Sequence, residues 1–366
     1  MENTKNKIGF VIGKLSSGGA ERVISTLSNE LIERFDVTII TFTESAPFYA
    51  LDERIKVISC QNLVEQPSSI FDSLKLNYIL VKRISEITKK EGINILIGFI
   101  TSANILTTIA AKLNRLPCII SERNNPLVEE VPKLWVLLRR FVYPLANSLV
   151  LQTKGVKKIY EKKIRPHKIT ILPNPIASEL SQLRTNQTKY KKIILTVGRL
   201  DKNKCHDELI TAFNTIKPEG WKVKIIGEGA KKQDLKTLIE SYNLDHKIEI
   251  ISKVKDIHKY YNEASIFVFT SKTEGFPNAL LEAMHYGLPC ISTDCNFGPS
   301  DLIDNGVNGF LIPVNDQSEL TDKLSHLIKD KKLQNKFSVK AKETTENYIS
   351  DKVVAQWESL INAHIK

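Results

Sequence analysis

The 366-residue sequence has few of the residues that mark a disulfide-stabilised or zinc-binding protein. It holds five cysteines, an odd number, without a Cys-x-x-Cys pair, and its histidines and cysteines do not cluster at the spacing of zinc ligands. The amino terminus, MENTKNKIGFVIG, lacks an apolar run long enough for a signal peptide. These absences exclude a disulfide-stapled miniprotein and predict a reducing, cytoplasmic location.

The sequence also lacks a convincing membrane span. The segment Gly92–Ala111 has 20 residues without a charge, about the width of a bilayer, but several of them are asparagine, serine or threonine. We therefore expect a buried strand over Ile93–Ile100, followed by a helix from about Ser102 to Leu113. Thr101 or Ser102 would cap that helix.

Positive charge is unequally distributed along the chain. Lys+Arg number 52 against 41 Asp+Glu, a net charge of +11. Residues 1–176 hold 25 basic and 16 acidic side chains, or +9, whereas residues 177–366 hold 27 and 25, or +2. A basic first half is typical of a protein that meets a nucleic acid, a membrane surface or a phosphorylated substrate. The alternative is a solvated basic surface without a partner.

Short apolar runs alternate with helical patterns along the whole chain. This alternation predicts parallel strands joined by crossover helices, the doubly wound α/β class. In the first half we expect a helix over Gly19–Phe35 and strands at 7–13, 36–42, 93–100, 117–121 and 148–151. In the second half we expect strands at 192–197, 221–226, 248–251, 265–270 and 290–293.

The pattern stops and restarts, which together with the length predicts two domains. We expect a Rossmann-like domain over 1–176, a hinge over the polar segment 177–191 and a second Rossmann-like domain over 192–350. The helix over 351–366 has one apolar face that suits docking on either domain, including a return to the first. Ligands bind at the carboxyl ends of parallel strands, so functional motifs should lie in loops that follow strands.

Two such loops carry glycines and cations. The segment SSGGAER lies between the first strand and the first helix, and Gly18 and Gly19 would let the backbone approach an anion at the helix amino terminus. It is not a G-x-G-x-x-G fingerprint, and a structural turn is the alternative. The segment VGRLDKNK opens the second domain, and Arg199 and Lys204 would place two cations at one strand end. A charged surface loop is the alternative there.

A third loop, TEGFPNALLEA at 273–283, follows the strand expected at 265–270. Pro277 suits the first turn of a helix, and that turn would present N–H groups to an anion. Glu274 precedes this helix, and Glu282 lies in its second turn, within reach of a ribose diol. In a fourth loop, Gly298 permits a tight turn and Pro299 opens a short helix, followed by a turn into an edge strand after residue 309.

These motifs together resemble a GT-B glycosyltransferase of family 4, a retaining group that assembles polysaccharides and lipid-linked oligosaccharides. The matching pieces span nearly the whole chain in family order: SGGAER, PNPI at 173–176, VGRLDKNK, GEG at 227–229, TEGFPNALLEA and GLPCISTD at 287–294. Glu274 and Glu282 match the E-x7-E motif of the family. The resemblance implies two Rossmann-like domains that face each other across a cleft.

The resemblance also implies roles for individual residues. Arg199 and Lys204 would neutralise the donor diphosphate, Glu282 would bind the ribose, and Glu274 would act in catalysis at the donor sugar. The other implied donor-binding residues are Gly18 and Gly19 at the phosphates, Val254 at the base, and Gly275, Phe276, Pro277, Asn278, Ala279 and Leu280 at the sugar and diphosphate.

Fixed cations and helix N–H groups aimed at the leaving diphosphate would lower the barrier to transfer. Carboxylates near the ring can stabilise the oxocarbenium-like state through which sugar transfer passes. The chain has no Asp-x-Asp motif, so we expect catalysis without a metal and without a further cofactor, with the charge supplied by Arg199 and Lys204. The resemblance implies retention, with the leaving phosphate accepting the proton of the acceptor.

One loop departs from the family pattern. Many relatives carry a histidine after the strand that matches 117–121, whereas this chain has Ser-Glu-Arg-Asn-Asn-Pro and no histidine before His167. Glu122 is therefore a candidate catalytic residue that would orient the sugar or the acceptor hydroxyl. Arg123 and the neighbouring Asn124 are candidates to bind the acceptor, with Arg123 on an acceptor phosphate.

The segment Val131–Ala146 combines an apolar stripe with Lys133, Arg139 and Arg140, and seven cations follow between residues 154 and 168. Apolar groups beside cations are typical of an interfacial membrane contact, and a core-facing helix with solvated lysines is the alternative. We include Arg139 and Arg140 among the acceptor-binding candidates. The pattern favours a polyprenyl-diphosphate-linked or polysaccharide acceptor at the inner face of the cell membrane.

Competing functions remain open at this point. Another GT-B activity with a soluble acceptor, or an epimerase, would share the fold, although the E-x7-E arrangement favours transfer. A non-catalytic nucleotide-binding module is a second alternative, and Glu274, Arg199 and Lys204 argue against it. No nucleic-acid-binding motif occurs, which argues against a nucleic-acid partner. On resemblance, the donor is a UDP-sugar, with N-acetylhexosamine or galactose favoured over glucose.

Overall fold

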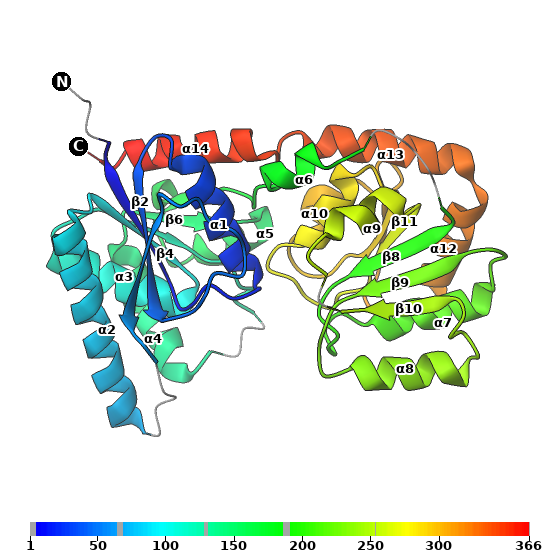
Figure 1. Cartoon of the computed structure of the whole chain (residues 1–366), viewed down its shortest axis with the longest axis horizontal. Coiled ribbons are helices and arrows are strands. Elements are labelled where there is room, and N and C mark those ends of the chain that lie inside the picture. Colours follow the sequence, from blue (N-terminus) through cyan, green and yellow to red (C-terminus); the bar gives the residue numbers. More distant parts are fainter. Residues whose placement is uncertain (1–4, 64–68, 128–130, 186–190, 253, 366) are drawn as a thin grey trace. The chain divides into compact units, whose positions relative to one another are not determined.

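The computed structural model describes residues 5–63, 69–127, 131–185, 191–252 and 254–365 (Figure 1). The chain divides into two compact units. Unit 1 comprises residues 1–175 together with 350–366, and unit 2 comprises residues 176–349. Each unit is a parallel sheet flanked by helices, which is the predicted doubly wound Rossmann-like class.

Unit 1 has a seven-stranded sheet in the order β3-β2-β1-β4-β5-β6-β7. All its strand pairs are parallel, and β1 pairs with β2 from Lys7 opposite Asp36. The strands are β1 (Lys7–Ile12), β2 (Asp36–Thr43), β3 (Lys56–Gln61), β4 (Ile95–Phe99), β5 (Cys118–Ser121), β6 (Ser148–Leu151) and β7 (Ile169–Ile171). The order reverses between β1 and β4, which places the switch point of the sheet there.

The helices of unit 1 cover both faces of this sheet. They are α1 (Gly19–Leu31), α2 (Ile70–Glu91), α3 (Thr101–Leu113), α4 (Lys133–Val142), α5 (Lys154–Tyr160) and α14 (Ser350–Asn362), with short 3-10 turns η1 (Tyr143–Leu145) and η2 (Pro166–Lys168). Helix α1 forms because Val23, Leu27 and Leu31 recur on one face and are buried on the sheet. It ends four residues earlier than the periodicity predicts, at Leu31.

Unit 2 has a six-stranded parallel sheet in the order β10-β9-β8-β11-β12-β13. The strands are β8 (Ile193–Val197), β9 (Lys222–Ile226), β10 (Ile248–Ile251), β11 (Ile266–Phe269), β12 (Cys290–Thr293) and β13 (Phe310–Ile312). The helices are α6 (Ser178–Gln182), α7 (His206–Ile216), α8 (Lys232–Ser241), α9 (Ile257–Glu263), α10 (Asn278–His285), α11 (Pro299–Leu302), α12 (Gln317–Lys329) and α13 (Lys331–Thr345). Its switch point lies between β8 and β11.

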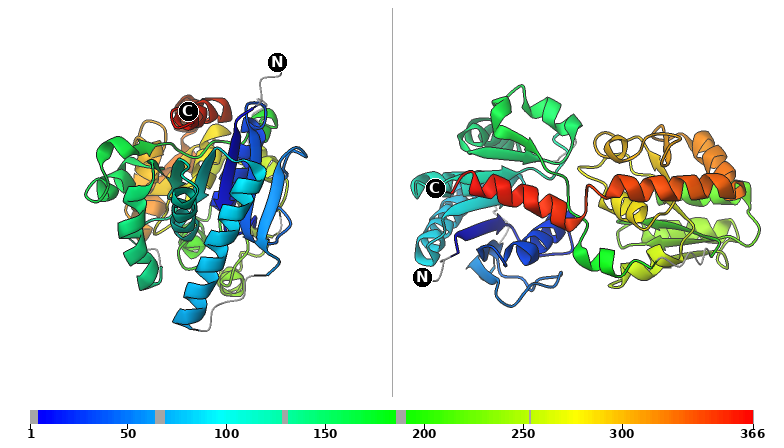
Figure 2. Two further views of the ribbon diagram at one scale, coloured as in Figure 1. Left: turned by 90° about the vertical axis from the view of Figure 1, so that its left-hand side faces the viewer. Right: turned by 90° about the horizontal axis from the view of Figure 1, so that it is seen from above.

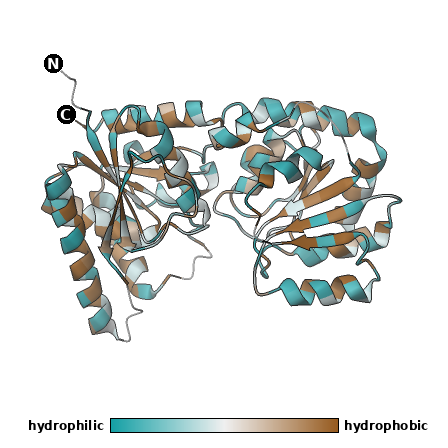
Figure 3. Ribbon diagram, viewed as in Figure 1, coloured by the Kyte–Doolittle hydropathy of each residue, from teal (hydrophilic) through white to brown (hydrophobic). Residues whose placement is uncertain are grey.

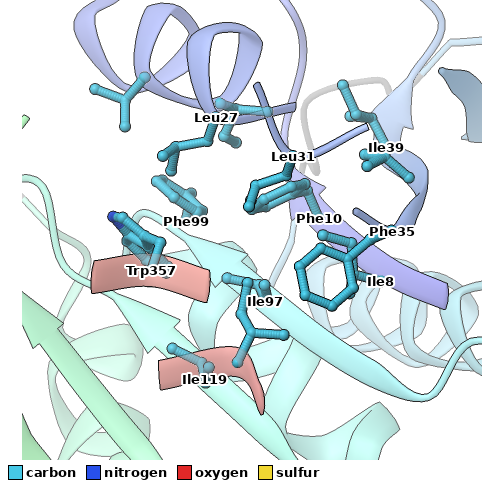
Figure 4. Packing of buried hydrophobic residues seen from close by; sticks show 14 of the residues in the cluster. Ile8, Phe10, Leu27, Leu31, Phe35, Ile39, Ile97, Phe99, Ile119 and Trp357 are labelled. Carbon is cyan, nitrogen blue, oxygen red and sulfur yellow. The ribbon is translucent and has the colours of Figure 1, made fainter. Parts of the chain in front are cut away.

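The strands of both sheets are rich in hydrophobic residues, as Figure 3 shows, because sheets covered on both faces bury nearly every strand residue. In unit 1 the core includes Trp357 of α14, whose ring stacks on Phe99 of β4 with centroids 5.8 Å apart (Figure 4). Helix α14 lies beside α1 and along unit 1 when the molecule is viewed from above (Figure 2). The last helix therefore completes the core of unit 1.

Two local expectations differ from the structure. The segment 177–191 was expected as a hinge, but Leu180 on α6 is buried in the core of unit 2, and residues 186–190 lie outside the described residues. The predicted side-chain cap of α3 is wrong: the cap residue is Ile100, and Thr101 lies inside the helix. The Thr101 hydroxyl donates to the Glu122 carboxylate at 2.9 Å.

Among the residues that the structure describes, no helix is both long and apolar enough to span a bilayer. The uncharged segment 92–111 forms β4 and most of α3 instead.

Candidate functional site

The loops after β8 and β11 flank the switch point of unit 2, and three hydrogen bonds hold them together. The Asn203 side-chain amide donates to the Thr273 carbonyl at 2.9 Å, and the Lys272 N–H donates to the Asn203 carbonyl at 2.8 Å. The Thr270 hydroxyl donates to the Lys204 carbonyl at 2.7 Å. The two motifs predicted to bind the donor therefore form one continuous edge, although about 70 residues separate them in the sequence.

Lys204 and Glu274 meet at this edge. The Lys204 Nζ lies 2.5 Å from the Glu274 Oε1, and both side chains are mostly buried. The same ammonium lies 5.0 Å from the centroid of the Phe269 ring, which adds a cation–π contact. Arg199 is exposed, with its Nε 3.3 Å from Asp201. The site thus holds one largely buried cation, Lys204, and a second, exposed one, Arg199.

Two glycines of the GEG motif let the β8 loop pass close to the β9 loop. A Cβ at Gly227 would overlap the carbonyl oxygen of Gly198, and a Cβ at Gly229 would overlap the backbone of Leu200. The backbone hydrogen bonds from Gly198 N–H to Ile226 and from Leu200 N–H to Glu228 require this approach. The motif therefore fixes the backbone that carries Arg199 and Lys204.

This close approach predicts a local effect of G227A. Because the obstructing atom is backbone, the new methyl group should displace the Gly198–Leu200 loop, at a stability cost of about 1–3 kcal/mol. We expect it to weaken the binding of UDP, the donor nucleotide predicted from the sequence, by about 10-fold or more. The matched control is G13A, since a Cβ at Gly13 meets only the Phe42 ring, at 4.0 Å. UDP titration by calorimetry measures the effect. Equal affinity of G227A and the parent protein would contradict it.

Helix α10 begins at the same edge. Pro277 occupies the cap position rather than the first turn, with φ −86° and ψ 73°, close to an inverse γ-turn. The Asn278 N–H closes that turn on the Phe276 carbonyl at 3.0 Å. By helix geometry, the N–H groups of Ala279 and Leu280 have no acceptor within α10. Because the Asn278 N–H is already bonded to the Phe276 carbonyl, the start of α10 offers an anion one N–H group fewer than the sequence predicts.

The loop before α11 packs onto this turn. Gly298 has φ +115°, and a Cβ there would overlap the Pro277 ring. Thr273 also forms a bridge with Asn296. The loop in which a tight turn at Gly298 was expected therefore packs against the Gly-Phe-Pro turn and supports it.

Glu282 is almost fully buried, and the Tyr261 hydroxyl of α9 donates to its Oε2 at 3.0 Å. This contact orients the carboxylate predicted to bind a ribose. Phe276 is buried, and Val254 packs partly buried against the same cluster. Sequence reasoning missed Tyr261, because nothing in the spacing of the two residues marks their contact.

His206 is a second residue that sequence reasoning missed. Its Nε2 lies 3.2 Å from the Arg199 carbonyl, and its Nδ1 lies 3.4 Å from the Thr196 hydroxyl. Burial lowers the pKa of His206 to about 4, so the ring is neutral near pH 7. Through its contacts with the Arg199 carbonyl and the Thr196 hydroxyl, the neutral imidazole connects β8 and its loop to the start of α7. Its position two residues after Lys204 was a signal that the sequence offered.

The carboxyl edge of unit 1 contains a buried carboxylate. Glu122 follows β5 and accepts hydrogen bonds from the Tyr143 hydroxyl at 2.6 Å, the Thr101 hydroxyl at 2.9 Å and the Arg123 N–H at 3.0 Å. Asn104 in turn donates to the Tyr143 hydroxyl at 3.0 Å. Burial and the Glu122 charge raise the pKa of Tyr143, which stays a donor. These donors satisfy an ionised carboxylate and orient it inward.

Arg123 is also buried. Its guanidinium lies 4.8 Å from the Phe99 ring and 5.8 Å from the Trp357 ring, and its Nη1 donates to Asn174 at 2.5 Å. Gln152 donates to the same Asn174 oxygen at 2.8 Å. Burial lowers the pKa of Arg123 to about 9. The PNPI motif therefore anchors the candidate acceptor residue, whereas Asn124 is only partly buried.

Within the described part of the chain, the Nε and Nη2 of Arg123 have no hydrogen-bond partner. Arg140 on α4 is exposed and Arg139 partly exposed. The acceptor roles of these arginines and of Asn124 stay predictions.

In the loop after β1, the Glu21 carboxylate lies close to Gly18. A Cβ at Gly18 would overlap the Glu21 carboxylate, which accepts from the Ser16 hydroxyl at 2.7 Å. Gly18 caps α1, and Gly19 begins it. Glu21 thus lies at the positive end of the helix. The donor-binding role of Gly18 and Gly19 stays a prediction.

No group of three or more His, Cys, Asp or Glu side chains in the described ranges is arranged to hold a metal ion.

The two Rossmann-like parallel-sheet units have the GT-B fold of glycosyltransferases. The family described as "Glycosyltransferase Family 4" matches residues 17–180, and "Glycosyl transferases group 1" matches residues 181–344. The chain belongs to glycosyltransferase family 4.

Two curated relatives come from Campylobacter jejuni. One is named N-acetylgalactosamine-N,N'-diacetylbacillosaminyl-diphospho-undecaprenol 4-alpha-N-acetylgalactosaminyltransferase; it is 30% identical over 95% of this chain and 96% of its own length. The other is named GalNAc-alpha-(1->4)-GalNAc-alpha-(1->3)-diNAcBac-PP-undecaprenol alpha-1,4-N-acetyl-D-galactosaminyltransferase; it is 28% identical over 97% of this chain and 98% of its length.

Among solved structures, HepE of Anabaena in complex with UDP is similar. Its TM-score is 0.80 with 18% identity, covering 98% of this chain and 100% of that one. At this identity the likeness shows the fold.

Proposed function

We propose that this glycosyltransferase moves a hexose or N-acetylhexosamine, with retention, from a UDP-sugar to a membrane-associated lipid-linked saccharide or surface polysaccharide. The observation that carries the donor side is the contact of Lys204 with Glu274 at the switch point of unit 2. It places an ammonium for the diphosphate beside a carboxylate for the sugar. Glu282, oriented by Tyr261, supplies the ribose contact.

The chemistry follows from this arrangement. The bond between the anomeric carbon and the diphosphate oxygen breaks, and the bond to the acceptor oxygen forms on the same face of the sugar. The proton of the acceptor hydroxyl goes to the leaving phosphate. Lys204, Arg199 and the amino end of α10 stabilise the negative charge that develops on the diphosphate. Glu274 binds sugar hydroxyls and stabilises the positive ring.

The acceptor side of the proposal rests on unit 1. The basic charge of residues 1–176 and the exposed apolar side chains of α4 favour a substrate held at an anionic membrane surface. The Campylobacter relatives are named for undecaprenol-linked substrates, which supports a polyprenyl-diphosphate acceptor for this chain. A soluble acceptor is the second candidate.

The first test is thermal unfolding in the presence of a panel of UDP- and GDP-sugars, with and without EDTA. We expect one or more UDP-sugars to raise the melting temperature equally in EDTA, since side-chain cations supply the charge. At a hundredfold excess over Kd the stabilisation is about 2.7 kcal/mol. A shift that EDTA abolishes would contradict metal-independent binding. No shift with any nucleotide sugar would contradict the transferase assignment for this chain.

A further inference from the structure

An open cavity of about 570 Å³ lies at the amino ends of the strands of unit 1. Asn94 lies directly before β4, Pro117 before β5 and Asn147 before β6. Residues at the carboxyl ends of α3 and α14 complete the lining. Glu122 follows the opposite end of β5, so a ligand in the cavity leaves the carboxyl edge of this sheet open. The volume is within the usual range for small-molecule sites.

Two asparagine side chains present hydrogen-bond donors to this cavity. The Asn94 Oδ1 accepts from the Lys7 N–H at 2.8 Å, and the Asn147 Oδ1 accepts from the Cys118 N–H at 3.1 Å. Because a backbone N–H engages each oxygen, the NH₂ group is the part of each side chain that remains for a ligand. Neither NH₂ group has a hydrogen-bond partner within the described part of the chain.

Positive charge accumulates at the same place. Lys112 and Arg115 line the cavity, and neither forms an ion pair with another described residue. Among the residues that the structure describes, no Asp or Glu lines the cavity. Burial, followed by the charge of Lys112, lowers the pKa of Lys168, which shows that these two cations lie close together. Three full charges outweigh the roughly half negative charge at the end of each of the two helices.

The backbone of Arg115 is unusual for its side chain. It has φ +55°, and it follows α3 at a position where the Leu116 N–H donates back to the Ala111 carbonyl at 2.9 Å. Glycine is the usual residue there, and a larger side chain has a steric cost. Lys217 ends α7 of unit 2 with φ +47°, so this conformation alone marks no site. At Arg115 it coincides with a cavity lined by donors.

We propose that this cavity binds a phosphate monoester on a small organic body, either a sugar phosphate or a nucleoside monophosphate. The oxygens of the phosphate dianion accept hydrogen bonds only, which matches a lining of two cations and two amide NH₂ groups. The Arg115 guanidinium can bind two phosphate oxygens at once, and Lys112 adds a compact charge. Leu116, Pro117 and Ile365 form an apolar wall for the organic body.

The end of α14 links this cavity to the core of unit 1. His364 lines the cavity, and its Nε2 lies 2.8 Å from the Ser148 hydroxyl at the start of β6. One turn or more earlier, Trp357 of the same helix is buried in the core. A bound ligand therefore connects the end of α14 to the starts of the strands and should raise the unfolding temperature of unit 1. Its position away from Glu122 makes it a regulator and not a substrate.

Two variants remove donors without removing structural contacts. R115N takes away the guanidinium and suits the left-handed backbone. N147D keeps an oxygen for the Cys118 N–H and replaces the NH₂ group with a charged oxygen that repels phosphate. The matched control is K217N, which removes an exposed cation from the same backbone conformation in unit 2. Calorimetric titration with inorganic phosphate, glucose-6-phosphate or adenosine monophosphate measures binding to each protein.

We expect the parent protein to bind one of the organic phosphates more tightly than inorganic phosphate, and the tighter one identifies the organic body. R115N and N147D should each bind it about tenfold or more weakly, since a hydrogen bond to a charged group contributes at least this much to affinity. K217N should bind it with parental affinity. Without ligand, R115N should melt at or above the parental temperature, which separates a binding role of Arg115 from a structural one.

Three results would overturn the inference. They are equal affinity for inorganic phosphate and both organic phosphates, parental affinity of R115N and N147D, and displacement of the bound phosphate by UDP at a concentration that just saturates the donor site. The last result would place the ligand in unit 2. The inference is independent of the proposed function, because failure of the parent protein to bind UDP would contradict that function and leave the cavity in unit 1 unaffected.

Discussion

The E274Q variant is expected to keep its fold and its affinity for UDP while its rate of sugar transfer falls by about 10²–10³-fold. Glutamine retains an oxygen that can accept from Lys204, so the contact at the loop edge survives. The negative charge proposed to stabilise the sugar ring is lost. Because the carboxylate no longer competes for Lys204, UDP should bind as tightly as to the parent enzyme or more tightly.

The effect should therefore appear in kcat and not in the affinity for the donor, which separates a catalytic role from a binding one. Single-turnover transfer, UDP titration and thermal unfolding measure the three quantities. The matched control is E240Q, an exposed carboxylate on α8 whose loss should change none of them. A fully active E274Q enzyme would overturn the role of Glu274. Weaker UDP binding with unchanged kcat would make it a donor-binding residue only.

Among the substitutions predicted for this protein, removal of the Glu122 carboxylate should lower the free energy of unfolding the most. The E122A variant leaves the Tyr143 hydroxyl, the Thr101 hydroxyl and the Arg123 N–H without their acceptor in the interior of unit 1. Each unsatisfied buried donor carries a desolvation penalty, and the neighbouring Arg123 loses the compensating charge. We expect the free energy of unfolding of unit 1 to fall by about 3–5 kcal/mol.

Urea unfolding followed by tryptophan fluorescence in a W221F background measures this, since Trp221 belongs to unit 2 and Trp357 to the core of unit 1. The Y143F variant, which removes one donor, should cost about 1–2 kcal/mol. The exposed Y78F variant should cost nearly nothing. If E122A unfolded at the parental urea concentration but lost transferase activity, Glu122 would act on the substrate, and the stabilising effect assigned to its hydrogen bonds with Tyr143, Thr101 and Arg123 would be wrong.

Most strands could be predicted from the sequence, although β3 and β7, the two outer strands of the unit 1 sheet, were not. The strands at 148–151, 248–251 and 290–293 have the predicted bounds. For the buried strand β6 the reason is that a strand covered on both faces is a mostly apolar run that stops where polar loop residues begin. The edge strand β13 was recognised from the asparagine–glycine turn before it. The motif loops followed their strands, and parallel topology brings such loops to one edge.

The partners of the site residues could not be predicted in the same way. Tyr261 contacts Glu282, and Asn104 reaches Glu122 through Tyr143, but these contacts follow from packing between helices that have no fixed spacing in sequence. Thr101 is a residue type that suits a helix cap, but α3 begins one residue earlier than expected, so Thr101 lies inside it and its hydroxyl donates to a carboxylate 21 residues away.

The return of α14 to unit 1 has a consequence for biosynthesis. A ribosome releases the whole of unit 2, residues 176–349, before Trp357 becomes available to stack on Phe99. Unit 2 is contiguous and can therefore complete its core during translation, whereas unit 1 must wait with an open apolar surface on β4 and α1. Nascent chains stalled before residue 350 should consequently present this surface to chaperones, and those stalled after the helix has emerged should not.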